Sequence, residues 1–184
     1  MKRLLLALLA ALAAPAAAQR TNSPGEVSGP VQGRVWEEDQ RRDRPESEAA
    51  LPAWPKNENL IEFQVANTSS FRFYIDAASL SLSPERIVRY TLIARSASGV
   101  ANVSYEGMRC PENQYRIYAY GQDGRWVRQR SDWRAIEPKP TQRWHQELST
   151  NYFCLARGTI LSVEEGLDAL RRGGHPGRKS GLGN

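Results

Sequence analysis

The sequence predicts an α+β fold, in which an antiparallel β-sheet of about five to six strands carries C-terminal helices on one face and one disulfide. Two observations lead to this fold class. Residues 60–128 contain short runs of alternating apolar and polar residues, joined by connections too short for crossover helices. Residues 141–172 then place apolar residues at helical spacing. A run of strands followed by helices packs most simply as two layers.

The predicted strands follow one another with turn signals between them. They cover residues 60–65, 71–76, 87–96, 100–108, 114–121 and a short returning strand from residue 125. Residues 77–86 contain Ser83-Pro84 and indicate a turn, while Asp123-Gly124 is a strong hairpin signal. Three acidic residues lie in these predicted strands. We expect Asp76 to cap a turn, and Glu62 and Glu106 to point to solvent.

Two amphipathic helices are predicted after the sheet. The first begins with Thr141 as a candidate N-cap and ends near residue 158. The second has a capping box, with Ser162 at the N-cap and Glu165 three residues later, and Gly173 suits its C-terminus. The first helix has an apolar stripe formed by Trp144, Leu148, Tyr152 and Leu155.

The N-terminal 18 residues have the pattern of a secretory signal peptide. Lys2 and Arg3 precede an apolar run too short to span a bilayer, and cleavage is expected between Ala18 and Gln19. No cysteine stands directly after that run to accept a lipid, so no lipid anchor is expected, and the shortness of the run argues against a membrane span. The mature protein should be periplasmic or secreted, with a disordered linker over 19–50, a domain over 51–157, a helix over 158–172 and a disordered basic tail over 173–184.

The charge of the chain gives little support to a nucleic-acid partner. Cleavage of the signal peptide removes two of the 25 basic residues and none of the 20 acidic ones, which leaves a net charge of about +3. Basic and acidic residues are interleaved, whereas a nucleic-acid-binding protein should show a one-sided basic patch. The tail sequence GHPGRKSG departs from the phosphate-loop pattern, and no predicted strand leads into it.

The chain has two cysteines, Cys110 at the end of a predicted strand and Cys154 near the end of the first predicted helix. In an oxidising compartment two such residues are expected to form a disulfide. The alternative is a cell-wall or thiol enzyme that uses Cys110 or Cys154 with His145 as its base. His145 is expected beside the apolar stripe of its helix and His175 in the tail. Their spacing matches no metal-binding motif, so no metal or other cofactor is predicted.

An aromatic row is the best candidate for a binding surface. Arg116, Tyr118 and Tyr120 alternate along one strand, and Arg89 extends the row from a neighbouring strand. Arginine and tyrosine are favoured where proteins bind partners, so this row predicts contact with a peptide, a glycan or another envelope protein. The predicted function is therefore a non-catalytic envelope binding or structural module rather than an enzyme. An adhesin-like surface protein that binds host or matrix partners is the alternative.

Several stretches in order resemble one family of exported proteins. They are LPAWPKNENLIEFQV, FRFYIDAASLSL, RYTLIARSASGVANVSYEGMRC, YRIYAYG and YFC, between Leu51 and Leu155. This sequence resembles the cryptic neisserial protein-like (CNP-like) family of uncharacterised proteobacterial exported domains. The resemblance implies an exported domain and supplies no functional residues, because the shared stretches are structural. A looser likeness connects the same strands to the sheet of surface-adhesin protein E, where a strand also reaches a disulfide cysteine.

Overall fold

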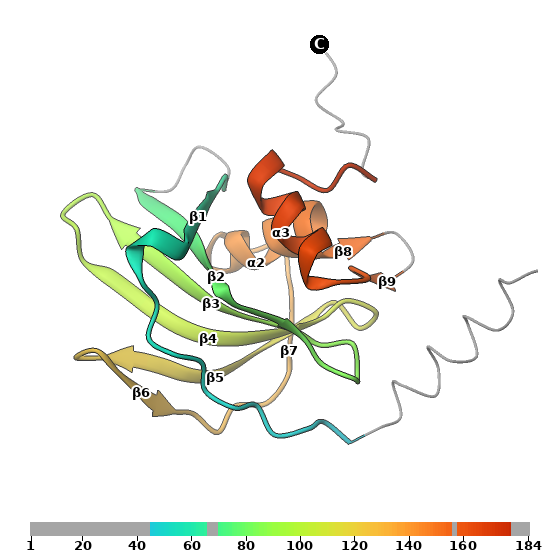
Figure 1. The fold of residues 1–184 in the computed structure, drawn as a ribbon, viewed down its shortest axis with the longest axis horizontal. Helices are drawn as coiled ribbons and strands as arrows, with labels where there is room; N and C mark the ends of the chain where they lie inside the picture. Colours follow the sequence, from blue (N-terminus) through green and yellow to red (C-terminus); the bar gives the residue numbers. More distant parts are fainter. Residues whose placement is uncertain (1–44, 66–69, 156–157, 178–184) are drawn as a thin grey trace, which may run out of the picture.

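Six antiparallel strands form a meander in the computed structural model, which describes residues 45–65, 70–155 and 158–177 (Figure 1). They are β1 (Leu60–Phe63), β2 (Phe71–Leu82), β3 (Val88–Ser96), β4 (Ala101–Arg109), β5 (Gln114–Gln122) and β6 (Arg125–Arg128), in this order across the sheet. A short strand, β7 (Arg134–Ala135), pairs with the beginning of β5. The predicted antiparallel sheet and α+β class are confirmed.

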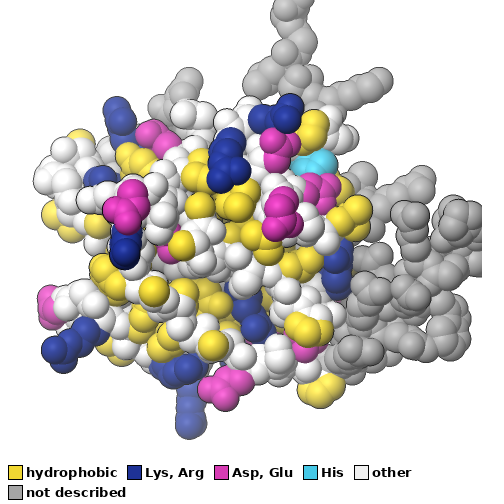
Figure 2. Space-filling model, in the orientation of Figure 1, with side chains coloured by type: hydrophobic (Ala, Val, Ile, Leu, Met, Phe, Trp, Pro, Cys, Tyr) yellow, Lys and Arg dark blue, Asp and Glu magenta, His cyan; other side chains and the backbone are white. Residues whose placement is uncertain are grey.

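Some of the sequence predictions concern residues outside these ranges. The predicted signal peptide, the linker up to residue 44 and the tail from residue 178 lie outside the described residues. Within the ranges that are described, no helix combines the length and the apolar character needed to cross a membrane. On the face shown in Figure 2, acidic and basic side chains lie beside one another.

Strand β2 is longer than predicted. The turn expected after Asp76 is instead a break in register, after which Ser81 and Leu82 pair again with β3. The Ser79 hydroxyl fills the break, because it donates to the Asp76 carbonyl at 2.8 Å and accepts from the Thr91 N–H at 2.8 Å. The turn follows at Ser83-Pro84. The other predicted hairpin is confirmed, since Asp123 and Gly124 both have the positive φ angles of a tight β-hairpin turn.

The helical elements lie together on one face of the sheet (Figure 1). They are α2 (Arg143–Glu147), a π-helix (Leu148–Phe153) and α3 (Val163–Arg172), with a small hairpin of β8 (Cys154–Leu155) and β9 (Gly158–Thr159) between them. The π-helix inserts a residue into the predicted 3.6-residue period, so both Tyr152 and Phe153 are buried in the core. The predicted disulfide between Cys110 and Cys154 is confirmed and fastens this layer to the end of β4.

The ends of the helices agree only in part with the sequence prediction. Thr141 is not an N-cap, because a 3₁₀ turn (Pro140–Gln142) precedes α2, and Gln142 occupies that position without a capping bond. Ser162 does cap α3, since its hydroxyl accepts from the Glu165 N–H at 3.2 Å. Gly173 ends α3 in the left-handed conformation, as predicted.

The opposite face of the sheet is covered by a segment that was predicted to be linker. Residues 45–52, here called the strap, lie across the outer face beside β5 and β6 (Figure 1). Ala49 is buried there in a small second cluster with Tyr105, Tyr118 and Ala119. The linker was predicted to extend to residue 50, whereas the structure describes the strap from residue 45 and buries Ala49. Three of its eight residues are polar, and Glu46, Ser47 and Glu48 form hydrogen bonds or ion pairs with the domain.

Candidate functional site

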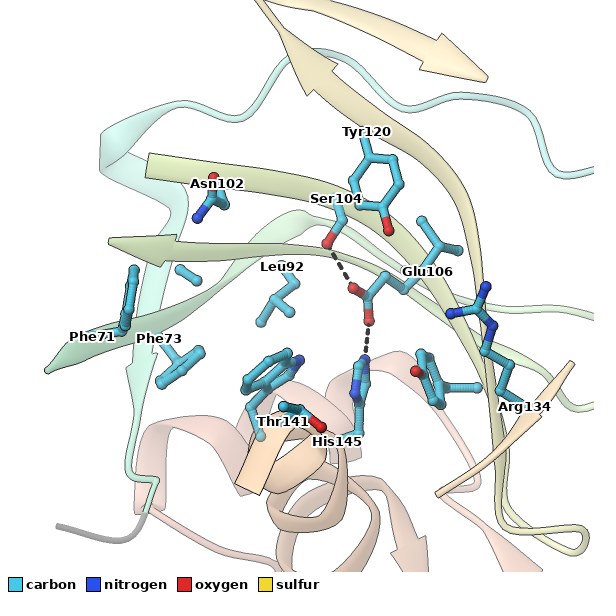
Figure 3. Close-up of a pocket in the computed structure, with 14 residues that line it drawn as sticks. Phe71, Phe73, Leu92, Asn102, Ser104, Glu106, Tyr120, Arg134, Thr141 and His145 are labelled. Carbon is cyan, nitrogen blue, oxygen red and sulfur yellow. Dashed lines mark hydrogen bonds and ion pairs between the residues drawn. The ribbon is translucent and has the colours of Figure 1, made fainter. Parts of the chain in front are cut away.

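A cavity of about 340 Å³ lies between the inner face of the sheet and helix α2. Apolar and aromatic side chains line one end of it, and polar side chains gather toward the other (Figure 3). The apolar end includes Phe71, Phe73 and Trp144, and the Phe73 and Trp144 rings stack with centroids 5.4 Å apart. The polar end is formed by Ser104, Glu106, Tyr120, Arg134 and His145, whereas Asn102 lies on the side of Phe71 and Phe73 (Figure 3).

A buried carboxylate, Glu106, is the centre of the polar end. It accepts hydrogen bonds from the Ser104 hydroxyl at 2.6 Å and the Tyr90 hydroxyl at 3.3 Å. The His145 ring contacts it through Nε2 at 2.8 Å (Figure 3). Both side chains of this pair are 3% exposed. Glu106 was predicted to point to solvent, and this prediction was wrong: its strand register places it between Ser104 and Met108 on the inner face, beneath α2.

His145 is held from two sides. Its ring stacks on Tyr115 with centroids 3.8 Å apart, while Nε2 contacts Glu106. His145 was expected beside the apolar stripe, at the border between the apolar and polar faces of its helix, but it is buried because α2 turns this residue onto β4 and β5. Its Nδ1 atom is buried without a hydrogen-bond partner among the residues that the structure describes. The same holds for the indole nitrogen of Trp144 on the cavity wall.

The tyrosine hydroxyls around Glu106 remain protonated at neutral pH. Burial and the negative charge of Glu106 raise the pKa of Tyr90 well above its ordinary value. Burial and the same carboxylate also raise the pKa of Tyr120, although nearby Arg134 opposes this effect. Tyr120 is 46% exposed, and its hydroxyl points toward Glu106 from the rim of the cavity (Figure 3). The Tyr90 hydroxyl therefore keeps the proton that it donates to Glu106.

Ser104 and the two cysteines are bonded to partners other than His145. Ser104 donates its hydroxyl hydrogen to Glu106 rather than to His145. Neither cysteine is free, because Cys110 and Cys154 are bonded to each other. The alternative of a thiol enzyme thus lacks its thiol. In the described part of the chain, no three His, Cys, Asp or Glu side chains converge as a metal site would require.

The predicted aromatic row is divided between the two faces of the sheet. Between β4 and β5, Tyr105 pairs with Ala119 but Glu106 pairs with Ile117, so Tyr118 is an extra residue in a β-bulge. Arg116 and Tyr118 consequently face the strap, whereas Tyr120 lines the cavity. Arg89 also lies under the strap and is 8% exposed. The row was expected on one open face, and the bulge and the strap prevent this.

The remaining residues named in the sequence analysis lie away from the cavity or outside the described residues. His175 is buried rather than in a free tail: its Nε2 contacts Glu165 at 2.8 Å, and its N–H donates to the Asn151 carbonyl at 2.7 Å. Asp76 is buried at the register break of β2. Ala18 and Gln19, the predicted cleavage site, lie outside the described residues. Sequence reasoning missed Arg134, which no motif marks, and the strap residue Glu46.

Comparison with known proteins gives one match. No curated protein and no solved structure matches this sequence. A family model described as the CNP1-like family matches residues 39–171, which include the strap, the whole sheet and nearly all of α3. The earlier resemblance is thereby confirmed, and the chain belongs to the CNP1-like family.

Proposed function

We propose that this protein is a non-catalytic binding module of the bacterial cell envelope, and that the cavity between the sheet and α2 is its ligand site. The observation that carries the proposal is the division of one cavity into an aromatic end and a polar end. Small-molecule sites are typically concave and largely apolar, with a few convergent polar groups that fix the orientation of the ligand. The volume of about 340 Å³ suits a small molecule.

The two ends of the cavity favour an amphipathic ligand with an anionic group. The stacked rings of Phe73 and Trp144 offer a flat apolar surface for a ring or a short chain. Arg134 lies exposed at the rim and forms no ion pair with any residue that the structure describes. The charge of Glu106 is already engaged by three partners, which leaves Arg134 to attract an anion.

The disulfide supports a location outside the cytoplasm, because such bonds persist in oxidising compartments. Together with the signal-peptide pattern of the sequence, this favours the periplasm, with an envelope component or an imported small molecule as the ligand. A non-catalytic role is supported by the hydrogen bond of Ser104, which holds Glu106 in place.

The test uses 1-anilinonaphthalene-8-sulfonate, a fluorescent probe with an aromatic body and an anionic group. The folded protein should bind it at one site, and R134A should weaken binding about tenfold or more, because a hydrogen bond to a charged group contributes about 1.5–3 kcal/mol. R125A is the matched control, since Arg125 is an exposed arginine of β6 that does not line the cavity. Its affinity should equal that of the wild type.

A second variant tests the place of binding. A94F adds a ring to the cavity wall at Ala94 and should abolish probe binding while the protein stays folded by circular dichroism. Equal affinities for R134A, R125A and the wild type would contradict the proposed anion contact. Undiminished binding to A94F would contradict the cavity as the ligand site.

A further inference from the structure

A second cluster of polar side chains lies on the other face of the sheet and does not involve the cavity. There the carboxylate of the strap residue Glu46 is surrounded by five donor side chains. Three are guanidinium groups, one is a tyrosine hydroxyl and one is an indole N–H. The N–O or O–O distances are 3.7 Å to Arg89, 3.6 Å to Arg109, 3.0 Å to Arg116, 2.6 Å to Tyr118 and 3.2 Å to Trp133.

The arginines are held in place by the sheet rather than by Glu46 alone. Arg109 lies over the Trp133 ring at 4.1 Å, and Arg89 and Arg116 lie near the Tyr118 ring at 5.6 and 5.5 Å. The three arginines come from β3, β4 and β5, and guanidinium groups are well suited to bind carboxylates. The guanidinium groups thus have contacts with the rings of the domain in addition to those with Glu46.

The site carries more positive charge than Glu46 neutralises. Three guanidinium groups face one carboxylate, which leaves an excess of about two positive charges by simple valence. The Arg89 side chain is only 9% exposed, and the Nε atoms of Arg89 and Arg116 are buried without a hydrogen-bond partner in the described part of the chain. Buried donors of this kind call for a more highly charged occupant.

The strap is bound in the manner of a peptide ligand. Among the described residues, its backbone forms no backbone–backbone hydrogen bond with the sheet. Its carbonyls accept from side chains instead: Ser47 from Arg89 at 2.6 Å, and Ala49 from Arg128 at 3.3 Å. Glu48, two residues after Glu46, is an exposed partner of Arg128 at 3.7 Å. The strap thus presents a Glu-x-Glu pattern to arginines of the sheet.

Space remains beside this contact. A second cavity of about 260 Å³ is lined by Glu46, Ser47, Glu48 and Ala49 from the strap, together with Arg116, Tyr118, Arg128 and Gln129 from β5 and the region of β6. Its position between Arg116 and Arg128 could accommodate a further acidic side chain.

We propose that this outer face is a binding site for an extended acidic peptide of a partner protein, and that the strap is a resident occupant which such a peptide displaces. The arginine cluster recognises the first carboxylate, and Arg128 recognises the second. In the resting protein Glu46 fills the site as an internal competitor. A tethered competitor acts at an effective concentration of about millimolar, so a partner binds weakly until it supplies more carboxylates than the strap does.

The experiment uses the full mature chain and a fluorescein-labelled peptide that copies residues 45–54, PESEAALPAW. The matched control peptide, PQSQAALPAW, has glutamine in place of both glutamates. In fluorescence anisotropy the glutamate peptide should bind E46Q at least about tenfold more tightly than it binds the wild type, because the internal carboxylate is gone. The glutamine peptide should bind neither protein, and adding R116A to E46Q should abolish binding of the glutamate peptide.

A measurement on the unaltered protein keeps the proposal testable if E46Q folds poorly. Millimolar glutamate peptide should increase amide hydrogen exchange in residues 46–51 of the wild type, and the glutamine peptide should not. Equal binding of the two peptides to E46Q, or no binding of either, would overturn the proposal. So would unchanged exchange in the strap at saturating glutamate peptide.

Discussion

Removal of the disulfide provides the most quantitative test of how the two layers are joined. In the double variant C110A/C154A, the unfolded chain regains the freedom of a loop whose ends are 44 residues apart. The chain-entropy relation assigns closure of such a loop about 13 cal/mol/K, or about 4 kcal/mol at room temperature. Because small domains are stable by only about 5–15 kcal/mol, this loss should take between about a quarter and four fifths of the free energy of unfolding.

Urea unfolding followed by tryptophan fluorescence measures the effect. The free energy of unfolding in water should fall by about 4 kcal/mol, which corresponds to a midpoint shift of about 2 M if the slope is near 2 kcal/mol/M. Wild-type protein with the disulfide reduced is the control, and it should unfold at the same urea concentration as the double variant. A loss below about 1 kcal/mol in both samples would refute the loop-closure reasoning. A loss in the variant alone would assign the effect to packing of Cys154 against Met108.

Three further predictions concern single side chains. E106L leaves three buried donors without their acceptor and should lower the free energy of unfolding by about 3–5 kcal/mol. E106Q should lower it less, and equal losses for the two variants in urea unfolding would contradict the stabilising role of these hydrogen bonds. G107A would place a Cβ 2.4 Å from the Tyr118 hydroxyl and should cost about 1–3 kcal/mol, so an unchanged melting temperature would show that this ring moves freely. Burial opposes ionisation of Glu165, but the Leu161 N–H and His175 outweigh it and lower the pKa of Glu165. The ionised Glu165 therefore stabilises the protein above the ordinary glutamate pKa of about 4.3, and this stabilisation is lost as the pH falls through the lowered pKa. The melting temperature of E165Q should consequently fall less in acid than that of the wild type. Identical dependence of the two melting temperatures on pH would contradict this.

The arrangement of strands could be predicted because each strand carries its own local signal. Alternating residues and short turns gave the meander, and Asp123-Gly124 gave the last hairpin. The second half of β2 could not be predicted, since its small residues and Ser83-Pro84 have turn-like composition. The Ser79 hydroxyl supplies the missing ladder bond there, and this contact depends on Thr91 in the next strand.

The two sites depend on contacts between distant parts of the chain. Glu106 and His145 are 39 residues apart, and neither shows in its own surroundings that the other will cover it. The strap has the composition of a linker. Its burial cannot be read from its own residues, because it depends on arginines from β3, β4 and β5. The Glu-Ser-Glu spacing was its one local signal, since alternate residues of an extended segment share a face.

The extra residue at Tyr118 has a consequence for how this domain can change over evolution. Up to the bulge, Arg116 and Tyr118 of β5 contact Glu46, and Tyr115 and Ile117 line the cavity. After the bulge, Tyr120 lines the cavity although its number is even. Substitutions can therefore alter either site alone. Loss of one residue from this strand would instead exchange the faces of everything beyond it, damaging both sites in a single event. Lineages that keep both sites should thus vary β5 in residue identity while conserving its length.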